Sequence, residues 1–142
     1  MARLWSMTVD YLTVSVGDQL PILVKWETSD SIRRLVAKYE LTTERDDESG
    51  ELSENLATPA PAIVGYVTEL LQKAFPIDSV TAEGSSLEFD LVKPINAGDT
   101  VSVFGEVVGK QENDGLRLVE CRIVIEKETG GIAATAYAVV SL

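Results

Sequence analysis

The chain has 142 residues, the length of one domain, and its 45% hydrophobic and 25% charged residues are typical of a globular protein. Twelve basic and 23 acidic residues give a formal net charge of −11. This charge argues against a nucleic-acid partner, because contacts to phosphates normally need a basic surface. We therefore predict a single globular domain over residues 1–142 that does not bind nucleic acid.

The sequence contains no histidine, which excludes Ser-His-Asp and Cys-His catalysis and histidine-ligated metals within this chain. The single cysteine, Cys121, cannot form an intrachain disulfide. It lies in the alternating apolar run Leu118–Ile125, a pattern that favours a buried strand residue over a nucleophile. We expect no bound metal and no cofactor.

The N-terminal residues lack the apolar stretch of a secretory signal, and no segment reaches the roughly 20 consecutive apolar residues of a membrane span. These observations predict a cytoplasmic protein without a membrane partner.

The first third of the chain predicts a strand and then a helix. The run Leu20–Glu27 is rich in β-branched and aromatic residues, as in a strand. Thr28, Ser29 and Asp30 are favoured helix N-cap residues. The apolar residues that follow recur at spacings of three and four, which is typical of an amphipathic helix. These residues are Ile32, Leu35, Val36 and Tyr39.

Residues 42–56 are polar and predict a loop. The stretch Glu44–Glu54 holds six acidic residues and one basic residue. Its carboxylates are possible ligands for a divalent cation, but their spacing fits no calcium-binding loop. A solvated loop is therefore the favoured interpretation.

A second helix is predicted over Ala60–Phe75 and ends at Pro76. Apolar side chains cover more than half of its circumference, so we expect it to be largely buried. These side chains belong to Ile63, Tyr66, Val67, Leu70, Leu71 and Ala74. The remainder predicts strands at Asp78–Glu83, Ser86–Val92, Thr100–Lys110, Leu116–Lys127 and Ile132–Ser141, the later ones separated by turn sequences. This order predicts an α+β fold, with one curved sheet wrapped around one buried helix.

Two segments carry a resemblance to a known family. Residues 16–21 read Val-Gly-Asp-Gln-Leu-Pro, and residues 89–101 read Phe-Asp-Leu-Val-Lys-Pro-Ile-Asn-Ala-Gly-Asp-Thr-Val. In this order and spacing they resemble motifs of the MaoC-like hydratases and dehydratases, over about Tyr11–Leu142. The resemblance implies a hotdog fold and an acyl thioester of coenzyme A or acyl carrier protein as ligand. It also implies addition or removal of water at the 2,3-position of the acyl chain.

The chain departs from the family at both catalytic motifs. The family's Asp-x-x-x-x-His pair would fall near Leu41 and Asp46, where no histidine stands. Residues 56–59, Leu-Ala-Thr-Pro, replace a motif whose glycine N–H polarises the thioester carbonyl, and Pro59 has no N–H. Residues 57–61 resemble the silent half of double-hotdog and heterodimeric members. The resemblance therefore implies a non-catalytic subunit, in a homodimer or in a heterodimer with a catalytic MaoC-like subunit.

Two alternative functions remain open at this point. Some hotdog thioesterases use only a carboxylate, for which the candidates here are Asp46, Asp47 and Glu69. An ordinary solvated pair with Lys73, four residues further on, also explains Glu69. The second alternative is a non-enzymatic dimer that binds an acyl or aromatic ligand.

Candidate ligand contacts fall into two groups. The expected wall of an acyl tunnel consists of Trp26, Thr58, Pro59, Tyr66 and Val67, for which core packing is the simpler role. The dense basic cluster Arg33, Arg34 and Lys38 is a candidate for coenzyme A phosphates, although solvated helix charges explain it equally well. The dimer seam is expected at an exposed sheet edge, where a long strand pairs with its counterpart.

Overall fold

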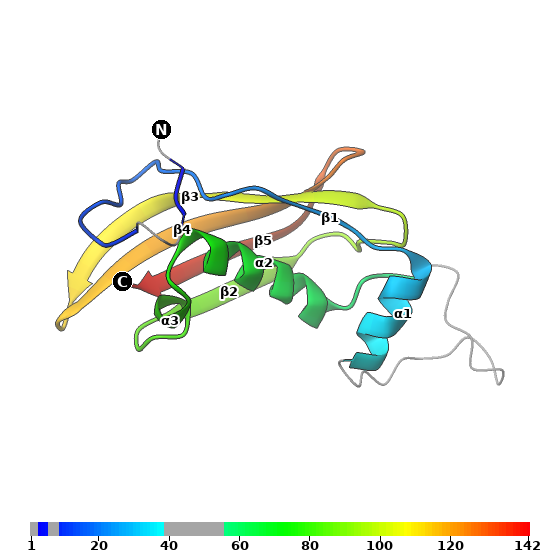
Figure 1. Ribbon diagram of the computed structural model, residues 1–142. Helices are drawn as coiled ribbons and strands as arrows, with labels where there is room; N and C mark the ends of the chain where they lie inside the picture. Colours follow the sequence, from blue (N-terminus) through cyan, green and yellow to red (C-terminus); the bar gives the residue numbers. More distant parts are fainter. Residues whose placement is uncertain (1–2, 6–8, 39–55) are drawn as a thin grey trace.

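The computed structural model of the chain describes residues 3–5, 9–38 and 56–142. Its described part contains three helices and five strands in an α+β arrangement (Figure 1), which confirms the predicted fold class. In chain order these are β1 (Leu23–Trp26), α1 (Ser29–Lys38), α2 (Ala60–Ala74), α3 (Ile77–Val80), β2 (Ser86–Leu91), β3 (Thr100–Asn113), β4 (Leu116–Lys127) and β5 (Ile132–Ser141). In this part of the chain, we find no helix with the length and apolar character needed to cross a membrane.

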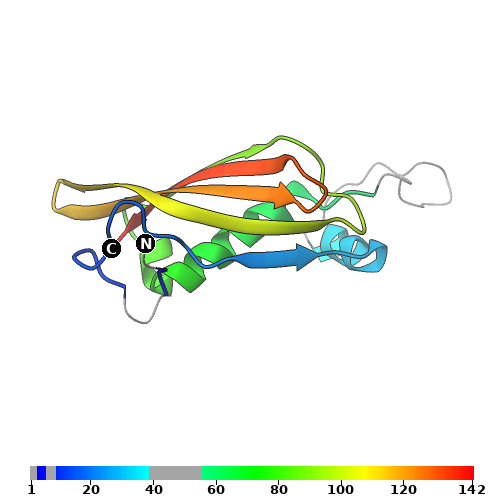
Figure 2. The same cartoon turned by 90° about the horizontal axis from the view of Figure 1, so that it is seen from above.

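The five strands form one antiparallel sheet in the order β1-β3-β4-β5-β2. The sheet curves along α2, and α1 lies beyond the end of β1 (Figures 1 and 2). Tight hairpins keep the long strands β3, β4 and β5 next to one another in the middle of the sheet. The edges are therefore the short strands β1 and β2, which corrects the prediction that a long strand lies at a free edge.

The hairpin between β3 and β4 follows the predicted turn at Asn113-Asp114-Gly115. Asp114 and Gly115 both have positive φ, 50° and 81°, as the two central residues of a type I′ turn require. This turn joins two strands of opposite direction with almost no loop, so it sets the register that begins at Asn113 opposite Leu116.

Helix α2 lies against the concave face of the sheet, and its apolar positions are buried as predicted. They form one core with the inward side chains of the central strands, among them Val103, Ile123 and Ala136. These strand residues alternate with exposed or half-buried neighbours, which is the pattern of a sheet with one covered face. This packing fixes α2 against the sheet and brings it close to β1, where the candidate site lies.

The predicted strand over Asp78–Glu83 is wrong. The chain instead forms the helical turn α3, with Pro76 at its N-cap position and the Ser79 N–H donating to the Pro76 carbonyl at 2.9 Å. Proline presets a backbone angle suited to a helix start, and Asp78 favours the first helical turn. These local preferences outweigh the short β-like pattern of the segment.

Candidate functional site

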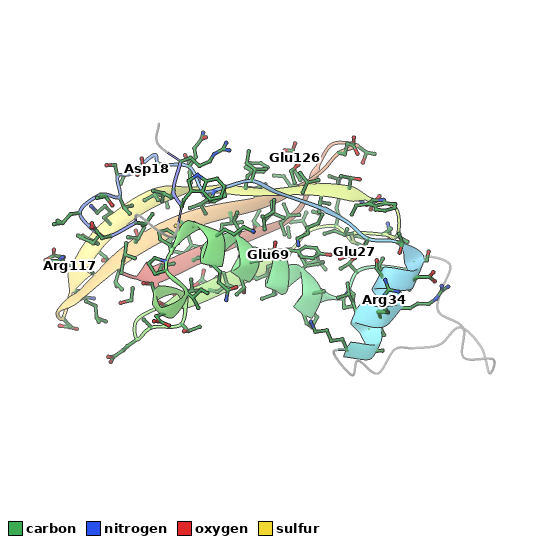
Figure 3. All side chains as sticks on the ribbon, in the orientation of Figure 1. Asp18, Glu27, Arg34, Glu69, Arg117 and Glu126 are labelled. Atoms are coloured by element: carbon green, nitrogen blue, oxygen red, sulfur yellow. The ribbon has the colours of Figure 1, made fainter. Side chains whose placement is uncertain are left out.

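A group of polar side chains bridges β1 and α2 at the edge of the apolar core. The Lys25 ammonium donates to the Glu69 carboxylate, with Nζ and Oε1 2.8 Å apart. The Tyr66 hydroxyl donates to Glu27 Oε2 at 2.5 Å, and Lys25 Nζ lies 5.3 Å from the centroid of the Tyr66 ring. Together with Thr58, these residues form what we call the β1–α2 polar cluster. Figure 3 shows Glu27 at the end of β1 and Glu69 on α2.

Strand alternation explains why β1 contributes to this cluster. Leu23 is buried in the core, and Lys25, two residues later, lies on the same face of the strand. Lys25 and Glu27 were not among the residues predicted for the site. The pattern that could have predicted them is the alternation on β1: one face of the strand carries buried Leu23 and then the charged residues Lys25 and Glu27.

The start of α2 has few backbone donors to offer. Pro59 is the N-cap residue and provides no side-chain cap, and both Pro59 and Pro61 lack an N–H. The Thr58 N–H is already used, because it donates to the Ile95 carbonyl at 2.7 Å. The structure thus places Pro59 at the helix start, where the sequence comparison expected a missing donor.

Thr58 and Tyr66 bring two hydroxyl groups to the same side of α2. Thr58 is 4% exposed, and within the described residues its hydroxyl makes no hydrogen bond of good geometry. A weak hydrogen bond from this hydroxyl to the Tyr66 oxygen opposes the rise of the Tyr66 pKa. Burial raises that pKa far above its ordinary value, and the Glu27 carboxylate raises it further. Tyr66 is therefore a neutral hydrogen-bond donor rather than a base.

The other predicted wall residues are divided between the two faces of the sheet. Pro59 and Val67 are buried, and Val67 is part of the core. Trp26 instead pairs with Thr100 on β3, lies on the outer face of β1 and is 61% exposed. Alternation on β1 turns Lys25 inward and Trp26 outward, so Trp26 lies on the opposite face of this strand from the polar cluster.

The candidate carboxylates have different outcomes. Asp46 and Asp47 lie outside the described residues, and so does Leu41, the other position expected for the family's catalytic pair. Glu69 forms its ion pair with Lys25 across the β1–α2 gap, rather than with Lys73 on its own helix. The side chains of Lys25 and Glu69 are 26% and 41% exposed, so the pair lies at the solvent rim of the cluster.

The predicted phosphate cluster lies on α1, away from the β1–α2 polar cluster. Arg33, Arg34 and Lys38 are all exposed, and Figure 3 shows Arg34 on this outlying helix. Arg33 makes an exposed contact of 3.3 Å with Asp30 one turn earlier. Exposed pairs of this kind contribute little to stability.

Cys121 is buried in the core, and burial, with a smaller contribution from Glu120, raises the pKa of its thiol from an ordinary 9.0 to about 12. We expect native protein at pH 8 to react with a thiol reagent such as Ellman's reagent far more slowly than urea-unfolded protein, because only the thiolate reacts. The contribution of the neutral thiol to the stability of the folded state is fully present below pH 9. It is lost as the pH rises from about 9 to about 12, because the unfolded chain releases this proton in that range before the folded protein does. Rapid stoichiometric labelling of native protein would show that Cys121 is an accessible nucleophile instead.

Comparisons with known proteins find matches among solved structures. No family model and no curated protein matches the sequence. A monoamine oxidase regulatory protein from Archaeoglobus fulgidus matches with a TM-score of 0.75 and 15% identity over 99% of this chain and 95% of that one. An (R)-hydratase from A. caviae involved in PHA biosynthesis matches with a TM-score of 0.69 and 19% identity, over 92% of this chain and 98% of that one. The ChsH1-ChsH2 complex from Mycobacterium tuberculosis matches with a TM-score of 0.64 and 22% identity, over 90% of this chain and 98% of that one.

The topology and these matches define the chain as a hotdog-fold protein. Its structural neighbours include a MaoC-like dehydratase from Rhodospirillum rubrum as well as the (R)-hydratase, so the expected resemblance to the MaoC-like group is confirmed in the fold.

Proposed function

We propose that this chain is a MaoC-like protein that binds an acyl thioester of coenzyme A or acyl carrier protein. In this proposal it is the non-catalytic subunit of a heteromeric enoyl thioester hydratase or dehydratase in the cytoplasm. The fold supports the ligand class by analogy, and the chemistry of the site must carry the rest.

The start of α2 carries this proposal. Hydration of an enoyl thioester needs a group that moves protons and a donor that stabilises charge on the carbonyl oxygen. The chain has no histidine, and at the helix start Pro59 and Pro61 lack N–H groups while the Thr58 N–H is bonded to Ile95. A partner subunit would then have to supply the catalytic pair.

Two structural neighbours are heteromeric by name, and both support a subunit role. One is the ChsH1-ChsH2 complex, and the other is the HadBC complex, a 3R-hydroxyacyl-ACP dehydratase from Mycobacterium tuberculosis. In our proposal the short edge strands β1 and β2 are the places where a second hotdog sheet can pair, in a homodimer or a heterodimer.

The β1–α2 polar cluster does not favour the carboxylate thioesterase. Glu69 is held by the Lys25 ammonium, and Glu27 accepts a hydrogen bond from the Tyr66 hydroxyl, so both carboxylates are already engaged by direct partners. A carboxylate that acts as a general base must instead be within reach of the proton it removes from the substrate.

Titration of the purified chain with crotonyl-CoA in a calorimeter tests the proposal, with free coenzyme A as the control for headgroup binding alone. The same samples are monitored for loss of the enoyl absorbance. We expect saturable crotonyl-CoA binding without hydration. Hydration or hydrolysis by the chain alone would contradict the non-catalytic role, and absence of binding would contradict the ligand class.

A further inference from the structure

The outer face of the sheet, which is turned away from α2, carries an apolar patch. In the described part of the chain, the helices lie on the concave side of the sheet or beyond the end of β1 (Figure 1). Ile22, Val24 and Trp26 follow one another on the outer face at β1 and are 53%, 65% and 61% exposed. The solvated face of an antiparallel sheet normally carries polar side chains. A contiguous exposed apolar patch therefore indicates an interaction surface.

A hollow continues the apolar patch onto β3 and β4. It has a volume of about 270 Å³, and its lining includes Ile22, Phe104 and Val124. Phe104 and Val124 are partners in the register of β3 and β4, so they lie side by side on the outer face. Both are half-buried, so part of each side chain remains accessible. This apolar hollow can accept one apolar side chain of a partner.

A second hollow lies on the other side of Arg122, a β4 residue that lines both hollows. It also has a volume of about 270 Å³, and its lining includes Glu88 and Asp90 of the edge strand β2 together with Tyr137 of β5. Glu88 pairs with Tyr137 in the strand register, and Asp90, two residues later, lies on the same face. The two carboxylates exceed the charge of Arg122, so this acidic hollow favours a cationic group.

The charges of the outer face determine the kind of partner. Glu106 on β3 and Glu126 on β4 add two carboxylates to those of Glu88 and Asp90, and Figure 3 shows Glu126 on the side of the sheet away from α2. The whole chain has a formal net charge of −11. A second copy of this chain would bring acidic side chains against an acidic face, which weakens association. A partner with basic side chains would complement the face instead.

We propose that the outer face of the sheet binds an amphipathic helix of a partner protein, with its apolar side chain in the apolar hollow and its basic side chain in the acidic hollow. The hollows are centred on β3 and β5, which are two strand spacings, or roughly 10 Å, apart. Residues seven positions apart on a helix lie on one side of it, about 10.5 Å from each other. This face is separate from the strand edges proposed for the hotdog partner, so the inference goes beyond the proposed function.

Binding of a labelled helical peptide to the full chain, measured by fluorescence anisotropy, tests this proposal. The probe carries leucine and lysine on one side at seven-residue spacing, and a matched peptide carries glutamate in place of lysine. We expect saturable binding of the lysine peptide and no binding of the glutamate peptide.

The apolar hollow is tested by Ile22→Thr, which should weaken binding of the lysine peptide about two- to tenfold, because a hydroxyl replaces an apolar contact. Ile77→Thr makes the same change on α3, at an isoleucine that is 65% exposed, and it should leave the affinity unchanged. Val124→Thr should weaken binding as Ile22→Thr does and provides a second test of the hollow. Circular dichroism checks that each variant is folded.

The acidic hollow is tested by Glu88→Gln combined with Asp90→Asn, which should weaken binding at least about fivefold. Asp78→Asn combined with Glu83→Gln removes the same number of charges at exposed positions outside the hollow. This control pair should change the affinity by less than about twofold.

Several results would overturn the proposal. Equal weakening by the two double variants would mean that the peptide responds only to the overall negative charge. Failure of the lysine peptide to bind, or binding that Ile22→Thr and Val124→Thr leave unchanged, would show that the hollows are not the site. Sedimentation of the chain alone tests the other occupant: a dimer that becomes a monomer in Ile22→Thr would mean that a second copy covers this face.

Discussion

Replacing Ile63 by alanine is expected to lower the free energy of unfolding by about 2–5 kcal/mol. Ile63 is fully buried near the start of α2 and belongs to the hotdog core. The substitution removes apolar contacts and leaves a cavity that the curved sheet cannot close. Urea denaturation followed by circular dichroism measures the loss, which should appear as a lower midpoint with an unchanged slope.

Ile77 provides a matched control for this prediction. It is also an isoleucine in a helix, but it is 65% exposed in the described structure. Ile77→Ala should change the free energy of unfolding by no more than about 0.5 kcal/mol. Equal losses at the two positions would mean that α2 is not the buried helix of this fold.

Gly105→Ala is expected to lower the free energy of unfolding by about 1–3 kcal/mol. A Cβ at this position of β3 would lie 2.5 Å from the Arg122 carbonyl oxygen of the neighbouring strand and 3.1 Å from Leu20 Cδ1. The first of these atoms belongs to backbone and can move only if the paired strands separate. Thermal unfolding of the variant should show a correspondingly lower midpoint.

Gly109→Ala, four residues further along β3, is the matched control. A Cβ there would meet the carboxylate end of Glu120, a flexible side chain that can swing away. We therefore expect a loss below about 1 kcal/mol, smaller than that at Gly105. If Gly109→Ala lowers the free energy of unfolding as much as Gly105→Ala, the backbone contact with Arg122 is not the reason that Gly105 resists substitution.

Local sequence patterns predicted most of the fold because the relevant interactions are short-range. The three- and four-residue spacing of apolar residues located α1, the broad apolar face before Pro76 located α2, and the Asn-Asp-Gly turn located the β3–β4 hairpin. The segment Asp78–Glu83 failed because a single helical turn after Pro76 is too short to show any periodicity. Its residues therefore looked like one more strand in a series.

The candidate site was harder to predict because its partners are far apart in the sequence. Lys25 and Glu69 are separated by 44 positions, and Glu27 and Tyr66 by 39. Only the packing of α2 along β1 brings them together. The outward position of Trp26 was also not evident from the sequence: a large aromatic residue suggests burial, but its register on an edge strand turns it outward.

We propose that this chain completes a hydratase or dehydratase without catalysing the reaction itself. The most direct measurement is crotonyl-CoA hydration on fractions from size-exclusion chromatography with mass detection. The chain is run alone and then mixed with a MaoC-like subunit that carries the Asp-x-x-x-x-His motif. We predict no turnover by this chain alone, and turnover in a mixed complex that contains both subunits. A homodimer of this chain that hydrates crotonyl-CoA by itself would contradict the account.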